Sequence, residues 1–209
     1  MPQVIAVTSE KGGVGKSTLA VHLAGALTER GLSAVLIDED DRLGSARRWA
    51  RRAEERGGLG FPVLAPDDVK PKRLAGLGAV VIDTEGRPKR GDLRRLAGRV
   101  DLLLVPSGVS ALELEAAADL LAFLREQGGA PARAVLTRVP PQGRAGAEAW
   151  GSLRAADLPV CEAVVRQYAA YPKAAELGLL CRDVPDSRAA EAWGDILALS
   201  REVLPGEGG

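Results

Sequence analysis

Residues 8–18 of the chain read Thr-Ser-Glu-Lys-Gly-Gly-Val-Gly-Lys-Ser-Thr. This stretch follows the phosphate-binding pattern G-x-x-x-x-G-K-[ST] except at its first position, where Glu10 replaces glycine. Its glycines let backbone N–H groups turn toward phosphate oxygens with no Cβ in the way. Lys16 is placed to reach the outer phosphates of a nucleotide, and the Ser17 hydroxyl is placed to bind Mg²⁺. The stretch therefore predicts a nucleotide-binding loop with an additional lysine, Lys11, at its front.

The sequence on either side has the order of elements that such a loop requires. Residues 3–8 (QVIAVT) are apolar and β-branched, as in a buried parallel strand. Residues 16–30 carry leucines at helical spacing, and a glycine comes next as a stop signal. A helix that begins at the loop also points its positive end toward a bound anion.

Apolar runs alternate with helical stretches along the rest of the chain. Further strands are expected at 33–38, 61–65, 79–83, 101–106, 132–138 and 158–165. Further helices are expected at 43–56, 67–77 with an interruption near Pro71, 91–98, 111–127, 144–156, 170–178 and 187–204. Ser110 is expected to cap the helix 111–127, with Glu113 completing a capping box. The alternation predicts a single-domain α/β fold of the P-loop NTPase type, in which a mainly parallel twisted sheet has helices on both faces.

Length and composition restrict the possible functions. The 209 residues suit one domain, expected over 1–204 with a flexible tail at 205–209. The 28 basic and 28 acidic residues cancel, so any contact with nucleic acid must come from a local patch. The chain has two distant cysteines, Cys161 and Cys181, and one histidine, which argues against a Cys/His zinc site. We expect neither a signal peptide nor a membrane span, and hence a cytoplasmic location.

Two of the expected strands end in aspartate, at the edge of the sheet where the phosphate loop lies. One strand delivers Asp83, as a Walker B strand does. The other delivers Asp38, and Asp40 lies two residues later. A magnesium ion bound with a nucleotide needs carboxylates beside the phosphates. These aspartates are therefore the candidate acidic partners of the loop.

Together these motifs resemble the ParA/MinD group of ATPases, which have a deviant Walker A loop. The likeness rests on KGGVGKST at 11–18, LIDED at 36–40, VVIDT at 80–84 and LLLVPSGVSALELEA at 102–116. It covers nearly the whole chain and implies an enzyme that hydrolyses ATP to ADP and phosphate, slowly without a partner. The implied ligands are ATP and Mg²⁺, and ATP would bring two subunits face to face as a homodimer.

The resemblance also assigns roles to residues of the site. The implied catalytic residues are Lys11, which would reach the partner's phosphates, Lys16, and Asp40, which would help to place the attacking water. Asp83 and Ser17 would hold the magnesium ion, and Asp38 would support them. The implied nucleotide-binding residues are Lys11, Gly12, Gly13, Val14, Gly15, Lys16, Ser17, Thr18 and, near the adenine, Arg138. A second ammonium group beside the triphosphate would also neutralise charge that develops during phosphoryl transfer.

Two loops depart from the family pattern. Asp40 is followed by Asp41 and Arg42 where the first switch usually continues with proline and glutamine. Glu85 and Gly86 come after Thr84 where the family often has proline. Both differences lie in switch loops, where they bear on hydrolysis and partner coupling more than on ATP binding.

Within the group, the chain is most similar to small stand-alone ParA proteins that segregate plasmids, chromosomes or large protein cargo. This implies an ATP-bound dimer that binds DNA non-specifically on the nucleoid, and a ParB-like adaptor that stimulates hydrolysis. We expect no N-terminal helix-turn-helix domain. The helix 187–204 has few basic residues, which favours a packing role over a membrane anchor. The alternatives are a MinD-like spatial regulator acting on protein or membrane partners, and a metabolic ligase of the dethiobiotin-synthetase type.

Contacts with DNA would be made to phosphates, without reading of base sequence. One candidate set lies late in the chain and comprises Arg144, Arg154, Arg166, Lys173 and Arg182. Two denser clusters comprise Arg42, Arg47, Arg48, Arg51 and Arg52, and Arg87, Lys89, Arg90, Arg94 and Arg95. The residues expected only to pack in the core are His22, Trp49, Trp150, Trp193 and the two cysteines.

Overall fold

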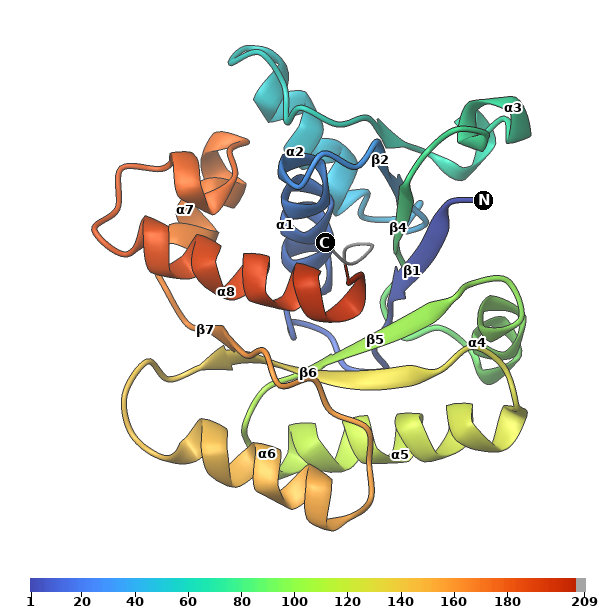
Figure 1. Ribbon diagram of the computed structural model, residues 1–209, viewed down its shortest axis with the longest axis vertical. Coiled ribbons are helices and arrows are strands. Elements are labelled where there is room, and N and C mark those ends of the chain that lie inside the picture. The colour runs from blue at the N-terminus through green and yellow to red at the C-terminus, as the bar shows by residue number, and fades with distance from the viewer. Residues whose placement is uncertain (206–209) are drawn as a thin grey trace.

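The strand that precedes the phosphate loop lies in the middle of a parallel sheet. The structure, a computed structural model, describes residues 1–205, and over these residues the sheet has seven strands in the order β3-β2-β4-β1-β5-β6-β7 (Figure 1). Each pair of neighbouring strands is parallel. The strands are β1 (Gln3–Val7), β2 (Ala34–Asp38), β3 (Val63–Leu64), β4 (Ala79–Asp83), β5 (Leu102–Ser107), β6 (Ala132–Val139) and β7 (Val165–Arg166). Residues 206–209, most of the expected tail, lie outside the described residues.

Helices cover both faces of this sheet, as the alternating sequence predicts. Figure 1 shows α1, α7 and α8 on one face and α4, α5 and α6 on the other. The α-helices of the described residues are α1 (Lys16–Glu29), α2 (Ser45–Glu54), α3 (Pro71–Leu74), α4 (Arg90–Ala97), α5 (Ala111–Gln127), α6 (Ala145–Ala155), α7 (Ala170–Leu177) and α8 (Ala189–Val203). Two short 3₁₀ turns, η1 (Pro66–Asp68) and η2 (Cys181–Asp183), complete them. The expected α/β fold is confirmed.

Alternate side chains of the strands supply two separate cores. In β1, Ile5 and Val7 join the core beneath α1 and α8, whereas Ala6 joins the core beneath α5. Successive side chains of a strand point to opposite faces, so a sheet covered on both sides needs strands that are apolar throughout. Because β1, β2 and β4 are parallel and in register, Val7, Asp38 and Asp83 end at one edge of the sheet. That edge carries the candidate site.

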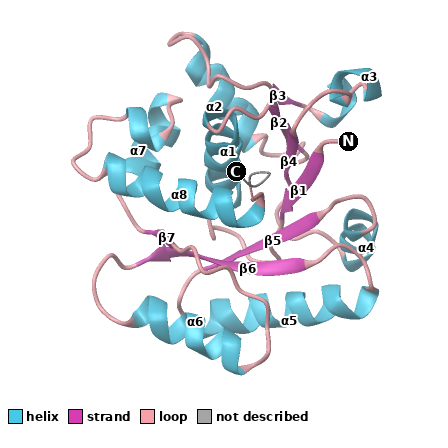
Figure 2. Cartoon of the chain, viewed as in Figure 1, coloured by secondary structure: helices cyan, strands magenta, loops and turns pink. Residues whose placement is uncertain are grey.

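Two expected strands are shorter than the sequence predicts (Figure 2). The segment 61–65 pairs only over β3, and the segment 158–165 makes one isolated bridge from Val160 to Ala134 before β7. In the second segment, side chains occupy the backbone groups that strand pairing would use. The indole of Trp150 donates to the carbonyl of Cys161, and the carboxylate of Glu202 accepts from the N–H groups of residues 162 and 163. The expected helix 67–77 is interrupted near Pro71 as predicted, and it forms η1 and α3, since proline at the start of α3 lacks an N–H.

The residues expected to pack in the core are buried, with one exception. His22, Trp49 and Trp193 lie in the core beneath α1, and both cysteines are buried and free. Trp150 is only half-buried and packs against the other core. No helix in the part of the chain that the structure describes is long and apolar enough to cross a membrane.

Candidate nucleotide-binding site

The phosphate loop between β1 and α1 encloses an open space. Gly13 and Gly15 have φ angles of +76° and +87°, which residues with side chains rarely adopt. A Cβ placed on Gly12, Gly13 or Gly15 would meet no atom within 4 Å. The N–H groups of residues 12–15 have no acceptor within residues 1–205. The loop therefore offers free donors beside the positive end of α1, which is the arrangement that a phosphate group requires.

Two buried hydroxyls hold the backbone of this loop. The Ser9 hydroxyl accepts from the N–H of Lys11 and donates to the carbonyl of Lys11, both at 3.0 Å. The Thr137 hydroxyl, which comes from β6, donates to the carbonyl of Val14 at 2.9 Å. Both hydroxyl-bearing residues are only 4% exposed. The loop is thus tied down at its front and at its middle.

Glu10, the departure from the general pattern, contacts α4. Its Oε1 lies 3.7 Å from Nε of Arg90, the first residue of α4, and the Arg90 guanidinium lies 4.2 Å from the centre of the Phe123 ring. Both charged side chains are partly exposed, so this ion pair adds little stability. A glutamate is accommodated at this position because its side chain is directed to α4. Sequence reasoning missed this contact of Arg90, which lies 80 residues further along the chain.

Asp38 and Asp83 lie opposite each other on β2 and β4, and both are fully buried. The carboxylate of Asp38 accepts from the N–H groups of Asp40 at 3.1 Å and Arg47 at 2.9 Å. Its Oδ2 also lies 3.6 Å from Nε of Arg47. Neither oxygen of Asp83 has a hydrogen-bond partner among the described residues. The Ser17 hydroxyl lies close to Asp83, but the pair does not reach hydrogen-bond geometry.

Burial dominates the ionisation of the two charged groups beside the loop. Burial raises the pKa of Asp83 to about 7, and the negative charges of Asp38 and Asp40 act in the same direction, while Ser17 and Lys16 oppose them. Burial lowers the pKa of the Lys16 ammonium, while Asp83 and Asp40 oppose that shift. A cation bound beside Asp83 would satisfy its free oxygens and favour the charged carboxylate. The donor set therefore fits Mg²⁺.

Asp40 and Lys11 lie at the entrance to this site. Asp40 is half-buried, and its side chain and carbonyl accept from the N–H groups of Leu43 at 2.8 Å and Gly44 at 2.7 Å. These bonds close a turn in front of α2. Lys11 is half-buried, and its ammonium forms no ion pair with any described side chain. Each residue thus presents a charge near the loop without a fixed partner of opposite sign among residues 1–205.

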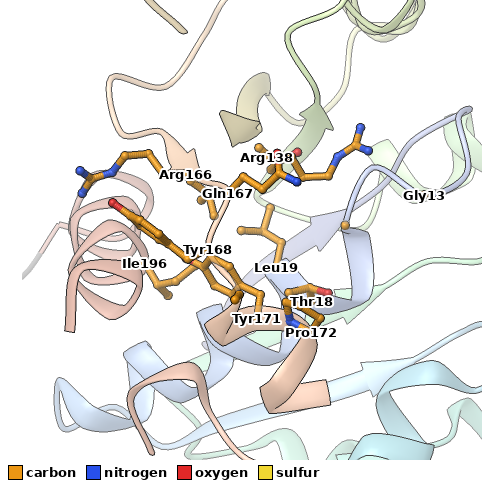
Figure 3. A pocket seen from close by; sticks show the side chains of 14 residues that line it. Gly13, Thr18, Leu19, Arg138, Arg166, Gln167, Tyr168, Tyr171, Pro172 and Ile196 are labelled. Carbon is orange, nitrogen blue, oxygen red and sulfur yellow. The ribbon is translucent and has the colours of Figure 1, made fainter. Parts of the chain in front are cut away.

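A cavity of about 470 Å³ adjoins the loop on the side of β6 and β7. Gly13, Gly15 and Thr18 form the end nearest to the phosphate loop. The opposite walls are largely apolar and aromatic, and Figure 3 shows Tyr168, Tyr171, Pro172, Leu19 and Ile196 around the space. Mostly apolar walls with a few polar groups are typical of sites for flat organic ligands such as a nucleotide base. No motif in the sequence assigns these tyrosines to the site, although their position just after β7 at the carboxyl edge points there.

A bulge in β6 places Arg138 on the wall of this cavity (Figure 3). Thr137 pairs with Val165 and Val139 with Arg166, so β6 has one residue more than β7 at this point. The extra residue, Arg138, has a φ of 52°, which is unusual for a residue other than glycine. Bulges of this kind redirect a side chain next to functional sites.

The expected capping box at the start of α5 is not formed in its usual way. Ser110 occupies the N-cap position, but its hydroxyl makes no bond to the helix backbone. Instead it donates to Oε2 of Glu113 at 2.6 Å. Arg138 forms an ion pair with the other carboxylate oxygen of Glu113. The cause of the difference is thus a tertiary contact, because Glu113 is drawn toward the bulged end of β6.

The phosphate loop, its buried aspartates and the sheet topology lead to one family. The family described as "CobQ/CobB/MinD/ParA nucleotide binding domain" matches residues 5–180. The chain belongs to this family. The resemblance noted from the motifs is therefore confirmed over most of the chain.

Individual relatives of the family agree with this assignment. The chain is 33% identical to "Maintenance of carboxysome distribution protein A" of Gloeobacter kilaueensis over 97% of this chain and 94% of that protein. It is 33% identical to "Protein ParA" of Rhizobium radiobacter over 59% of this chain and 57% of that protein. The solved septum site-determining protein MinD of Pyrococcus horikoshii, in complex with Mg-ADP, has a TM-score of 0.72 at 18% identity, covering 98% of this chain and 97% of that one. The last similarity concerns the fold alone.

The structure places the family's motifs at one edge of the sheet. Residues 11–18 surround the start of α1, with Asp38, Asp40 and Asp83 beside them. Arg138 lies further away, on the wall of the adjoining cavity. No group of three or more His, Cys, Asp or Glu residues within positions 1–205 could hold a metal ion by itself. A magnesium ion would therefore depend on phosphate and water for its remaining ligands, as Mg²⁺ commonly does.

Proposed function

We propose that the protein is a ParA-like ATPase that positions or partitions a cargo, either DNA or a large protein assembly. The observation that carries the proposal is the unpartnered, fully buried carboxylate of Asp83 beside an open glycine loop. A buried charge without a partner costs free energy, so its retention requires a ligand that satisfies it. Mg²⁺ bound with ATP is such a ligand.

Different residues of the chain would hold the phosphates, the magnesium ion and the base of the nucleotide. The free N–H groups of the loop and the Lys16 ammonium would hold the phosphates, with Thr18 at the start of α1. Ser17 and Asp83 would hold Mg²⁺, and Asp38 would support the site through its contacts with the backbone of Asp40. The bound ion would neutralise charge on the phosphates during transfer. The cavity with Arg138 on its wall would receive the adenine.

We assign Lys11 and Asp40 to hydrolysis in a dimer. The Lys11 ammonium has no partner of opposite charge among the described residues, whereas the Lys11 backbone is fixed by Ser9. A second subunit that faces this edge would bring its triphosphate within reach of that ammonium. Asp40, in the turn before α2, would then help to orient the attacking water. Hydrolysis would thereby depend on dimerisation.

For the DNA partner we favour the exposed face of α2. Three of the five late basic residues are paired within the chain: Arg166 with Asp195, Lys173 with Asp186 and Arg182 with Glu29. In contrast, four arginines line one hollow together with Glu55 and Glu176, and these arginines make no ion pair within the described part of the chain. They are Arg48, Arg51, Arg52 and Arg56. Arg52 and Arg56 donate to the carbonyls of Ala175 and Leu177, whereas the guanidinium groups of Arg48 and Arg51 make no hydrogen bond within residues 1–205. Guanidinium groups without a carboxylate partner are available to phosphates, which supports non-specific contact with DNA.

The relatives support a role in positioning or partition. One relative is a carboxysome distribution protein and another is a ParA protein, which supports the positioning or partition of a cargo as the shared activity. We therefore propose a cytoplasmic ATPase that the nucleoid retains in its ATP-bound dimeric form. A ParB-like adaptor on the cargo would stimulate hydrolysis and release the dimer from DNA.

Retention on DNA, combined with an ATPase assay, tests this function. Binding of the full chain to non-specific duplex DNA is measured with ATP, ADP or no nucleotide across a series of salt concentrations. We expect retention only with ATP and Mg²⁺, weakening steeply with salt. Retention on DNA that does not depend on the nucleotide contradicts the DNA part of the proposal. The absence of any retention even at low salt contradicts it as well. Sedimentation of the ATP-bound protein with liposomes, in place of DNA, would instead support a MinD-like role.

A further inference from the structure

The geometry points to Thr137 as a positioning residue for the phosphate loop, an inference that rests on the proposed binding of nucleotide. Its hydroxyl donates to the carbonyl of Val14 at 2.9 Å and lies 3.2 Å from the carbonyl of Ser107. Thr137 and Val14 are 123 positions apart in the sequence. The contact therefore ties the nucleotide loop to β6, two strands away from β1 in the sheet.

This hydrogen bond determines the direction of a peptide group that faces the ligand. In a trans peptide the C=O and the N–H point in opposite directions, and the described chain has no cis peptide. The carbonyl of Val14 is directed at Thr137, so the N–H of Gly15 points away from β6. That N–H has no acceptor within the described chain. Thr137 thus holds a free donor in the orientation in which a phosphate oxygen can accept its bond.

The chain on either side of this peptide group is also held in place. The Val14 side chain is 2% exposed and lines a small hollow with Val105 and Ala117. The carbonyl of Gly15 accepts the first helical bond of α1, from the N–H of Leu19 at 2.8 Å. Among the carbonyls of residues 9–15, that of Val14 is the one that accepts from a side-chain hydroxyl outside the loop within residues 1–205. Gly13 and Gly15 on either side have positive φ, and glycines in such conformations rotate easily unless a bond prevents it.

Preorganisation is the physical benefit of this contact. A loop whose donors are already aligned loses less conformational entropy when it binds a ligand. If the Val14–Gly15 peptide group could rotate, part of the binding free energy would be spent on ordering it. Ser9 acts in the same way on Lys11, but through bonds within the loop itself. Thr137 differs from Ser9 because its hydrogen bond comes from β6 and so fixes the loop relative to the sheet.

The test compares variants that keep or remove the hydroxyl. Thr137→Val preserves the shape of the side chain and cannot donate, whereas Thr137→Ser keeps the donor. Thr28→Val is the matched control, because the Thr28 hydroxyl donates to the carbonyl of Ala24 within α1, far along the helix from the loop. Two properties are measured for each: the affinity for a non-hydrolysable ATP analogue with Mg²⁺, and the amide hydrogen exchange of residues 10–19 in the nucleotide-free protein.

We expect Thr137→Val to bind the analogue about five- to tenfold more weakly, the effect of one net hydrogen bond. Its loop amides should exchange faster, while Thr137→Ser and Thr28→Val stay close to wild type in both properties. Thr137→Ala removes the same hydroxyl and must show the same losses, which covers a failure of Thr137→Val to fold.

Three results separate the possible failures. Affinity and exchange that are unchanged in Thr137→Val overturn the positioning role. An equal loss of affinity in Thr28→Val also overturns it, because the effect would then reflect general destabilisation. A wild-type protein that binds no nucleotide contradicts the proposed function itself, whatever the variants do.

Discussion

Asp38 and Asp83 lie opposite each other on neighbouring strands and are equally buried, yet only Asp38 has hydrogen-bond donors around its carboxylate. The difference arises in the loop after each strand. After Asp38 the chain turns back over the carboxylate, so that the N–H groups of Asp40 and Arg47 reach it. After Asp83 no described backbone N–H returns to the carboxylate. The register of two strands thus places a satisfied acid beside an unsatisfied one.

Removing the charge of Asp83 should stabilise the free protein. We expect Asp83→Asn to raise the free energy of unfolding without nucleotide by about 1–2 kcal/mol, since a neutral amide costs less to bury than a charged carboxylate. The variant should also lose the additional stabilisation that Mg²⁺ gives to the ADP-bound protein. Urea unfolding at pH 8, with and without ADP and Mg²⁺, measures both effects.

Asp38→Asn is the matched control for this experiment. Its carboxylate is hydrogen-bonded and lies near Arg47, so the same substitution should lower the stability of the free protein. A loss of stability in Asp83→Asn as large as that in Asp38→Asn would contradict a role for Asp83 as an unpaired carboxylate that binds a cation.

Substitution of each of the two lysines in the loop should have a different effect. Lys16→Ala should abolish measurable ATP binding, because Lys16 lies beside Asp83 at the phosphate end of the site. Lys11→Ala should bind ATP as a monomer with nearly unchanged affinity but remain monomeric. Calorimetry measures the binding, and light scattering coupled to gel filtration measures the mass with an ATP analogue. A Lys11→Ala protein that dimerises as wild type does would refute the contact across the dimer.

The local parts of this site are predictable from the sequence, and its distant contacts are not. Residues 11–18 are contiguous, and Asp38 and Asp83 terminate strands whose apolar character is evident, so their meeting at one edge is expected from parallel topology. The hydrogen bond of Thr137 to Val14 and the ion pair of Glu10 with Arg90 join segments that no local pattern connects. Their existence depends on tertiary packing.

The cavity beside the loop shows a second limit of sequence reasoning. Tyr168 and Tyr171 come just after β7, which ends one residue beyond the expected strand 158–165, but no motif marks these two residues as lining a cavity. The bulge at Arg138 is equally hidden, because it arises from the register of β6 against β7. The prediction that Arg138 is a site residue therefore rests on family resemblance, and the orientation of its side chain comes only from the structure.

Charge reversal on α2 should weaken binding to DNA. We expect Arg48→Glu with Arg51→Glu to reduce the slope of log affinity against log salt by about 2, one for each phosphate contact removed. The control is Arg144→Glu with Arg154→Glu on α6, where Arg144 lies near Glu148 and Arg154 lies over the Trp150 ring. Fluorescence anisotropy with ATP and Mg²⁺ measures the salt dependence of DNA affinity for both double variants. Equal slopes in wild type and the α2 variant would mean that DNA binds to another face of the protein.

His22 should make the stability of the protein depend on pH. Its Nδ1 lies 2.7 Å from the carbonyl of Thr18 and its Nε2 accepts from the N–H of Cys181 at 3.0 Å, so the neutral ring satisfies both contacts. The rings of Trp49 and Tyr171 pack edge-on against it. A proton on Nε2 would break the bond from Cys181 and place a charge in the core. Burial accordingly lowers the pKa of His22 from 6.5 to about 4.

In the unfolded chain His22 takes up its proton near pH 6.5, and in the folded chain only near pH 4. The stabilisation from the neutral ring is therefore complete above pH 6.5 and is lost as the pH falls toward 4. At about 1.4 kcal/mol per pKa unit, the loss amounts to roughly 3 kcal/mol. Protonation of Asp83, whose pKa burial raises to about 7, stabilises the folded protein over the same pH range and opposes this loss. Urea unfolding at pH 7.5, 5.5 and 4.5 is therefore measured in an Asp83→Asn background, where the loss should appear with Trp49 in place and in Trp49→Phe, which keeps the histidine. His22→Gln should lower stability at every pH but flatten the decline, and an unchanged decline in that variant would assign the pH dependence to other groups.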